Sequence, residues 1–138
     1  KLLQIWGEEK TSAFYKKWET LDNTQLELGD YIGLFKYSDA MIHDCSSFIV
    51  EYQFMDKPTL FLTMDDGSYV ESTLNKFGQD AYHCHSIAQN KEQIEKFVLK
   101  VIRGVDDNKK KREHLRKQYL LPPNGKTACE NIIDAILG

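Results

Sequence analysis

Apolar positions along this chain fall into two patterns, which together predict alternating strands and helices. Short apolar runs cover residues 40–42 and 59–62, each bounded by polar residues, as is typical of strands buried on both faces of a parallel sheet. Residues 31–35 and 46–54 place apolar side chains at helical intervals. Strand and helix therefore alternate, which favours an α/β fold with a parallel sheet, flanking helices and right-handed crossovers.

The segments on either side of this core predict further elements. Before and inside it we expect one or two short helices over residues 2–18 with an interruption near Gly7, a strand at 25–28, a short helix at 70–77 and a strand at 81–86. After it we expect a helix over 91–103 between Asn90 and Gly104, a charged helix stopped by Pro122 and Pro123, and a last helix begun by a capping box of Thr127 and Glu130.

Composition adds limits rather than an activity. The chain has 138 residues, enough for one domain, and its net charge of -3 gives no global basicity to suggest a nucleic-acid partner. Three cysteines without a CxxC pair indicate a reducing compartment, and no apolar run approaches the roughly 18 residues of a membrane span. We therefore expect a cytoplasmic protein. The chain lacks an initiator Met, so we also expect it to be a piece of a longer protein.

A polar turn between the two central apolar runs suggests a ligand site. Asp44, Ser46 and Ser47 follow the first predicted strand, and Glu51 lies one helical turn further on. In a parallel sheet the loops after the strands form the ligand crevice, and a helix start offers N–H groups and hydroxyls to an anion such as phosphate. A carboxylate at Glu51 suits hydroxyl groups such as those of a ribose. Together these residues suggest a nucleotide, although ordinary helix capping by Asp44 or Ser46 accounts for one or two of them equally well.

The whole stretch resembles a known family. Its matching residues run through Ser38, Asp39, Ala40, Met41, Ile42, Asp44, Ser46, Ser47, Glu51, Tyr52, Asp56, Lys57 and Pro58. This block resembles the CDP-glycerol glycerophosphotransferase family, the enzymes that build teichoic-acid-like poly(polyol phosphate) chains. His43 and Cys45 stand where that family usually has Thr and Tyr, and Glu51 stands where it has Asp. The family's upstream segment of the Lys-Pro-His-Pro type is not in the sequence.

The resemblance implies a fold and a set of roles. Residues 1–138 would be a single Rossmann-like, nucleotide-donor-binding domain, the C-terminal half of a two-domain GT-B enzyme whose N-terminal domain is missing. Ser46 and Ser47 would contact the donor pyrophosphate, Glu51 a donor hydroxyl, and Asp44 and His43 would complete the substrate-binding set. The expected donor is CDP-glycerol or a similar molecule, the acceptor a cell-envelope polymer or glycan, with no cofactor and no catalytic residue on this fragment. The resemblance also implies a cytoplasmic protein with peripheral contact to the inner face of the membrane.

Two other classes of function remain open from the sequence. One is a nucleotide-sugar glycosyltransferase or a UDP-N-acetylglucosamine epimerase-like enzyme of the same GT-B architecture. The other is a non-catalytic, flavodoxin-like interaction domain with Asp44 as its acceptor residue.

Three further clusters have both a functional and a simpler interpretation. His83 and His85, near Asp65 and Asp66, suggest a metal site, although a polar strand end is the more common reason for such a pair. A basic cluster of Lys109, Lys110, Lys111, Arg112, Arg116 and Lys117 suggests contact with an anionic surface, whereas a solvated helix face is the more common use. Trp6, Tyr15 and Trp18 suggest stacking on a ligand, whereas packing is commoner for aromatics.

Overall fold

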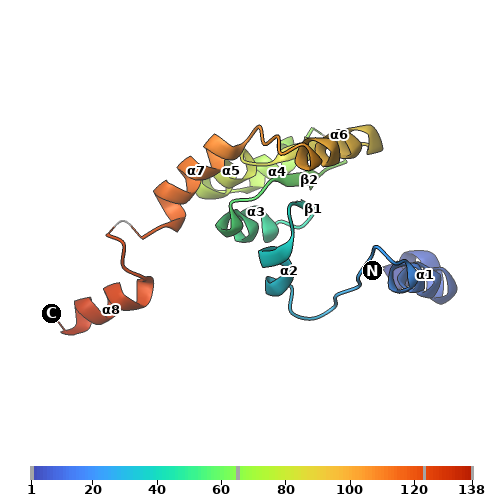
Figure 1. Ribbon diagram of the computed structural model, residues 1–138, viewed down its shortest axis with the longest axis horizontal. Helices are drawn as coiled ribbons and strands as arrows, with labels where there is room; N and C mark the ends of the chain where they lie inside the picture. The colour runs from blue at the N-terminus through green and yellow to red at the C-terminus, as the bar shows by residue number, and fades with distance from the viewer. Residues whose placement is uncertain (1, 65, 123, 138) are drawn as a thin grey trace. The chain divides into compact units, whose positions relative to one another are not determined.

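The computed structural model describes residues 2–64, 66–122 and 124–137, and the chain forms two compact units, one ending at Leu34 and the other beginning at Phe35. The first unit holds helix α1 (Leu2–Thr20). Gly7 interrupts α1 with φ 76° and ψ 173°, a conformation that favours glycine, so the expected interruption is confirmed. Figure 1 shows the helix as the blue element at the amino end of the chain.

The aromatic side chains of α1 pack on one another. The ring of Phe14 lies 5.5 Å from that of Trp6, 5.9 Å from that of Tyr15 and 6.1 Å from that of Trp18, each in an edge-to-face arrangement. Such pairs are a common packing geometry. Each of the three aromatics that had suggested a stacking surface therefore has a packing partner within α1, and Trp18 stays 42% exposed.

The prediction of a strand at residues 25–28 is wrong. These residues have no regular secondary structure, and helix α2 (Ile32–Tyr37) begins soon after them, with the Asp30 carboxylate accepting a hydrogen bond of 2.9 Å from the Ile32 N–H. A strand needs a neighbouring strand to satisfy its N–H and C=O groups. The described residues of the first unit include no such neighbour.

The second unit is built on a three-stranded parallel sheet. Strands β1 (Met41–His43), β2 (Thr59–Leu62) and β3 (Ser86–Ala88) lie in the order β1-β2-β3. Met41 pairs with Thr59 and Leu60 pairs with Ser86. The predicted α/β class, with a parallel sheet flanked by helices, is confirmed, and both central strands lie where the apolar runs placed them.

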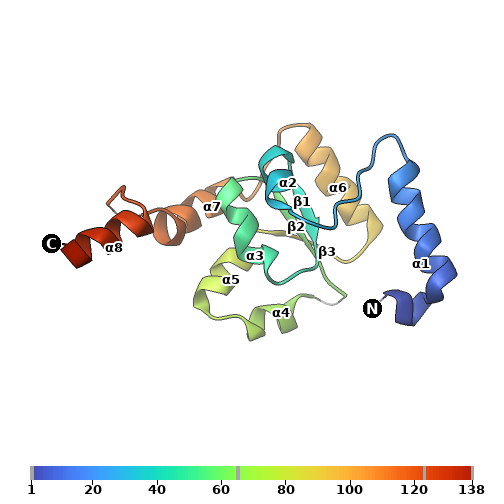
Figure 2. The same cartoon turned by 90° about the horizontal axis from the view of Figure 1, so that it is seen from below.

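Helices cover both faces of this sheet (Figure 2). Phe61 packs against Ile49, Ala81, Tyr82, Cys84 and Leu115 on one face, whereas Leu60 packs with Ala88 and Phe97 on the other. Consecutive strand residues point to opposite faces, which is why Leu60 and Phe61 belong to different clusters. The first face is covered by α3 (Phe48–Glu51), α5 (Lys76–Tyr82) and α7 (Lys109–Leu115), and the second by α6 (Lys91–Ile102).

The third strand begins later than predicted. Residues 81 and 82 end helix α5, and β3 starts only at Ser86, so the strand expected at 81–86 is wrong over most of its length. Ala81, Tyr82 and Cys84 are apolar because they face the sheet from the end of a helix. The helix expected at 70–77 is instead a pair, α4 (Ser68–Thr73) and α5, with Asn75 capping the second through a bond of 2.9 Å from the Gly78 N–H.

The predicted helix ends of the C-terminal half are confirmed. The Asn90 side chain caps α6 by accepting a hydrogen bond of 3.0 Å from the Gln93 N–H, and Gly104 follows its end with φ 69°. Thr127 and Glu130 form the capping box of α8 (Ala128–Leu137), with the Glu130 N–H 3.2 Å from the Thr127 hydroxyl oxygen and the Thr127 N–H 2.7 Å from the Glu130 carboxylate.

A buried arginine ties α7 to Asp56 and Asp106, which lie outside the strands, and this corrects the prediction of a solvated basic face. The side chain of Arg112 is 1% exposed and donates two hydrogen bonds to the Asp106 carboxylate, that from Nη1 measuring 3.0 Å. Its Nε lies 3.6 Å from Asp56, which also accepts a bond of 2.7 Å from Arg116. The neighbouring lysines of α7 are exposed, as expected. The basic cluster therefore divides into two arginines that pair with carboxylates, Arg112 and Arg116, and a solvent-facing set of lysines.

Candidate functional site

The polar turn lies where β1 leads into α3. β1 ends at His43, Asp44 follows it directly, and the chain turns through Ser46 and Ser47 into α3 and then a 3₁₀ turn, η1 (Tyr52–Met55). Asp44, Ser46 and Ser47 are all exposed. The turn therefore lies beyond the carboxyl end of a parallel strand, the position at which open α/β sheets bind their ligands.

Helix capping does not explain the two serines. Ser47 is the N-cap residue of α3, but its φ of -60° and ψ of -40° are helical and its side chain makes no capping bond. The local bonds run between backbone atoms, including Ile49 N–H to Ser46 C=O at 3.3 Å. Among the described residues, neither serine's hydroxyl or N–H group and no oxygen of Asp44 takes part in a hydrogen bond within the protein. These polar groups remain available to a ligand.

Several other residues of the same block have clear structural uses. Tyr52 is fully buried, and its hydroxyl lies 2.8 Å from that of Ser38. The Lys57 ammonium donates bonds of 3.2, 2.7 and 2.5 Å to the carbonyls of Phe35, Lys36 and Ser38, around the carboxyl end of α2. A cation suits that end of a helix because the last carbonyls lack partners there. The block therefore contains a scaffold and, separately, a small set of exposed polar groups.

His43 belongs to the scaffold side of this division. Its ring is buried, and its Nδ1 lies 3.0 Å from the Cys45 carbonyl oxygen, to which it donates. Edge-to-face contacts join it to Phe61 at 5.3 Å and His85 at 5.1 Å. Burial lowers the pKa of His43, which keeps the ring neutral. The structure thus separates His43 from the exposed turn, and its role as a substrate contact stays a prediction.

Glu51 ends α3, four residues after Ser47, and is exposed. One helical turn therefore separates the carboxylate from the serines along the chain. Cys45, between Asp44 and Ser46, is half-buried, and its carbonyl supports His43.

Comparison of the chain with models of known protein families shows which family it belongs to. A family model described as CDP-Glycerol:Poly(glycerophosphate) glycerophosphotransferase matches residues 14–138. The chain belongs to this family. Neither the curated proteins nor the solved structures gave a match. The resemblance seen in residues 38–62 is confirmed, and the match places this glycerophosphotransferase-family chain among transferases.

The histidines that suggested a metal site do not act together in this family member. His83 is exposed and its Nε2 lies 2.8 Å from the Glu71 carboxylate, whereas His85 is buried with its Nδ1 3.0 Å from the Ala81 carbonyl oxygen. They follow helix α5 instead of sharing a strand face, and Asp65 lies outside the described residues. Among the residues whose positions the structure gives, no group of three metal-binding side chains occurs.

One property of the helices bears on membrane contact. Of the helices in the described parts of this glycerophosphotransferase-family chain, none combines the length and the apolar character required to cross a bilayer.

Proposed function

We propose that this chain is the donor-binding domain of a glycerophosphotransferase that moves a polyol phosphate from CDP-glycerol, or a similar CDP-activated donor, to a cell-surface polymer or glycan. The family match supports the class of enzyme. The observation that carries the site is the polar turn, in which Asp44, Ser46 and Ser47 are exposed and their side chains form no internal hydrogen bonds among the described residues. Polar groups without a structural use, placed after a parallel strand, favour a ligand-binding role.

In this proposal the serines bind the donor pyrophosphate. Their hydroxyls and N–H groups supply hydrogen-bond donors to phosphate oxygens, and such bonds to charged acceptors are stronger than neutral ones. Glu51 accepts hydrogen bonds from donor hydroxyls, and Asp44 completes the turn. His43 supports this turn from below by its bond to the Cys45 carbonyl.

The reaction then requires only electrostatic help from this chain. An acceptor hydroxyl oxygen attacks the β-phosphorus of the donor, a new phosphorus–oxygen bond forms, and the bond to the bridging oxygen breaks to release CMP. The hydroxyl and N–H groups of Ser46 and Ser47 donate hydrogen bonds that stabilise the negative charge on CMP as it departs. The hydroxyl proton goes to a general base in the second domain of the longer enzyme that we propose this chain belongs to.

Calorimetry on the Ser46→Ala and Ser47→Ala double variant tests the site. Loss of bonds to a charged phosphate predicts CDP-glycerol binding weaker by about 2 kcal/mol, or roughly thirty-fold, with the circular dichroism spectrum unchanged. Ser12→Ala, an exposed serine of α1, is the control and should bind like the parent chain. Equal affinity in the double variant and the parent would remove these serines from the site.

The same titration separates the donor classes. CDP-glycerol should bind more tightly than a UDP-sugar, because the family description names CDP-glycerol as the donor. A clear preference for the UDP-sugar would favour a nucleotide-sugar enzyme of the same architecture, and the proposed donor would then be wrong.

A further inference from the structure

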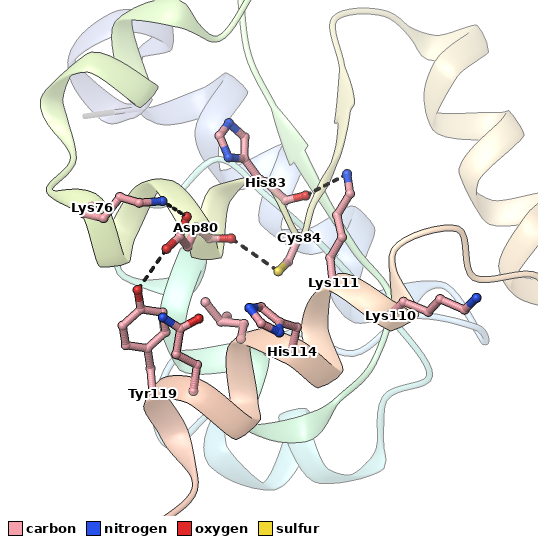
Figure 3. A pocket seen from close by; sticks show the side chains of 10 residues that line it. Lys76, Asp80, His83, Cys84, Lys110, Lys111, His114 and Tyr119 are labelled. Atoms are coloured by element: carbon pink, nitrogen blue, oxygen red, sulfur yellow. Dashed lines mark hydrogen bonds and ion pairs between the residues drawn. The ribbon is translucent and has the colours of Figure 1, made fainter.

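A cavity lies between α5 and α7, on residues that the proposed donor site does not use (Figure 3). Its volume is about 530 Å³, within the roughly 300–1,000 Å³ of small-molecule sites. The lining residues are Lys76, Asp80, His83, Cys84, Lys110, Lys111, His114, Leu115, Gln118 and Tyr119. His83 and Cys84 come just before β3 begins. This part of the cavity therefore lies at the end of the sheet where the strands start, whereas the polar turn follows the opposite, carboxyl end of β1.

The cavity wall is positively charged. Three lysines and one aspartate line it, which gives a net charge of +2 with the histidines neutral. Asp80 is already occupied, because Lys76 forms an ion pair with it and the Tyr119 hydroxyl donates to it at 3.0 Å. Two lysines of α7, Lys110 and Lys111, remain without an acidic partner among the described residues. The surplus positive charge therefore comes from α7.

The floor of the cavity is apolar. Cys84 and Leu115 are each 2% exposed and belong to the core cluster under the sheet. Burial raises the pKa of the Cys84 thiol to about 11, so it is a neutral, unreactive part of this floor. The ring of Tyr119 forms part of the wall and packs against Phe77 with 5.0 Å between centroids.

Lys111 and His114 add polar side chains to the cavity. Lys111 Nζ lies 3.3 Å from the His83 carbonyl oxygen at the end of α5, which uses one of its three N–H groups and ties the lysine to the cavity. His114 points into the space between the two helices in Figure 3 and has no hydrogen-bond partner among the described residues. Polar donors therefore surround a small apolar base.

We propose that this cavity binds a phosphate ester of a small alcohol, with its phosphate against Lys110, Lys111 and His114 and its carbon chain over Cys84 and Leu115. Charge selects the phosphate, and the apolar floor favours an ester over inorganic phosphate. The same headgroup chemistry occurs in a free ester and in a phospholipid, so the test compares both sources. The proposal does not rest on the donor site, because it uses none of the residues 44–51.

The test is titration of the full 138-residue chain with glycerol 3-phosphate at fixed ionic strength, followed by calorimetry and by amide NMR shifts. We expect saturable binding, weaker binding of inorganic phosphate, and shifts centred on Cys84, His114 and Tyr119. The Lys110→Gln and Lys111→Gln double variant should lose at least about ten-fold in affinity. The matched control, Lys109→Gln with Lys117→Gln, removes equal charge from exposed residues of the same segment outside the cavity and should bind like the parent.

A single variant and a vesicle-binding measurement complete the test. Lys110→Gln alone removes no internal hydrogen bond among the described residues, so it should fold normally and still weaken binding. Tighter binding to phosphatidylglycerol vesicles than to neutral vesicles, lost in the same variants, would identify the lipid headgroup as the source. Absence of saturable binding to both probes, equal losses in the two double variants, or shifts confined to residues 44–51 would overturn the proposal. Nucleotide affinity is measured separately, so failure here leaves the donor site untouched.

Discussion

Replacement of Arg112 by Met should destabilise the protein by about 3 to 5 kcal/mol, because it removes a buried cation that pairs with Asp106 and leaves Asp56 paired with Arg116. The guanidinium is 1% exposed and serves Asp106 through two hydrogen bonds and Asp56 through an ion pair of 3.6 Å. Without it the Asp106 carboxylate, 20% exposed, loses both hydrogen bonds from the guanidinium. Urea unfolding followed by circular dichroism measures the loss as a lower midpoint with an unchanged slope.

Two matched variants separate charge burial from simple loss of packing. Arg112→Met combined with Asp106→Leu removes both partners and should recover part of the stability, since an apolar pair avoids an uncompensated charge. Arg116→Met removes a more exposed partner of Asp56 and should cost clearly less. A loss below about 1 kcal/mol for Arg112→Met would show that the network does not hold α7 in place.

The network also shows where prediction from the sequence stops. Both central strands, the helix caps at Asn90 and Thr127 and the parallel topology followed from local patterns. Arg112 did not, because a run of Lys and Arg has the same local pattern whether all its members are solvated or one is buried. Only the tertiary position of Asp106 and Asp56 decides which side chain is drawn inward.

The prediction of the third strand was wrong for a related reason. Apolar residues at 81–84 fit either a short strand or a helix end that faces the sheet, and the length of the run cannot separate them. The structure places Ala81 and Tyr82 in α5, and the strand begins only at Ser86. Competing local patterns of this kind are decided by long-range packing, here against Phe61.

The candidate site was predicted from the chemistry of its residues, and its role in binding a ligand stays a prediction. The sequence identified Asp44, Ser46 and Ser47, but it left capping as an equal explanation, and the absence of a capping bond in the structure removes that explanation. It also grouped His43 with them, whereas the ring is buried beside His85. Neighbouring positions along a strand end can face opposite environments, and the amphipathic nature of histidine gives no signal of which one applies.

Acidification from pH 6.5 toward 4 should destabilise the fold, with His85 as the main histidine responsible. Burial, and then the proximity of His43, lower the pKa of His85 to about 4. An unfolded histidine titrates near 6.5, so the unfolded chain takes up a proton that the folded chain refuses. The stability from neutral His85 is therefore complete above pH 6.5 and is lost as the pH falls to about 4, a total of about 3 kcal/mol.

The hydrogen bonds of His85 give the physical reason for this sign. Its Nδ1–H donates to the Ala81 carbonyl, so Nε2 is the acceptor and lies 3.4 Å from the Gln53 amide nitrogen. A proton on Nε2 would set two donors against each other in a fully buried position beside the His43 ring. A flip of the Gln53 amide would turn Oε1 toward this proton. It would also place the NH2 group where Oε1 now lies without a partner among the described residues, so it would restore only part of the loss.

Chemical unfolding at a series of pH values measures the effect, and the interval from 6.5 to 5 is the most informative because few carboxylates titrate there. His85 alone should account for about 2 kcal/mol in that interval. His85→Leu should lower stability at pH 7, since the Ala81 carbonyl loses its donor, yet it should flatten the slope between pH 6.5 and 5. His114→Leu, at an exposed histidine of α7, is the matched control for the loss of an imidazole. A His85→Leu slope equal to that of the parent would assign the acid sensitivity to other groups, with His43, the second buried ring, the next to replace.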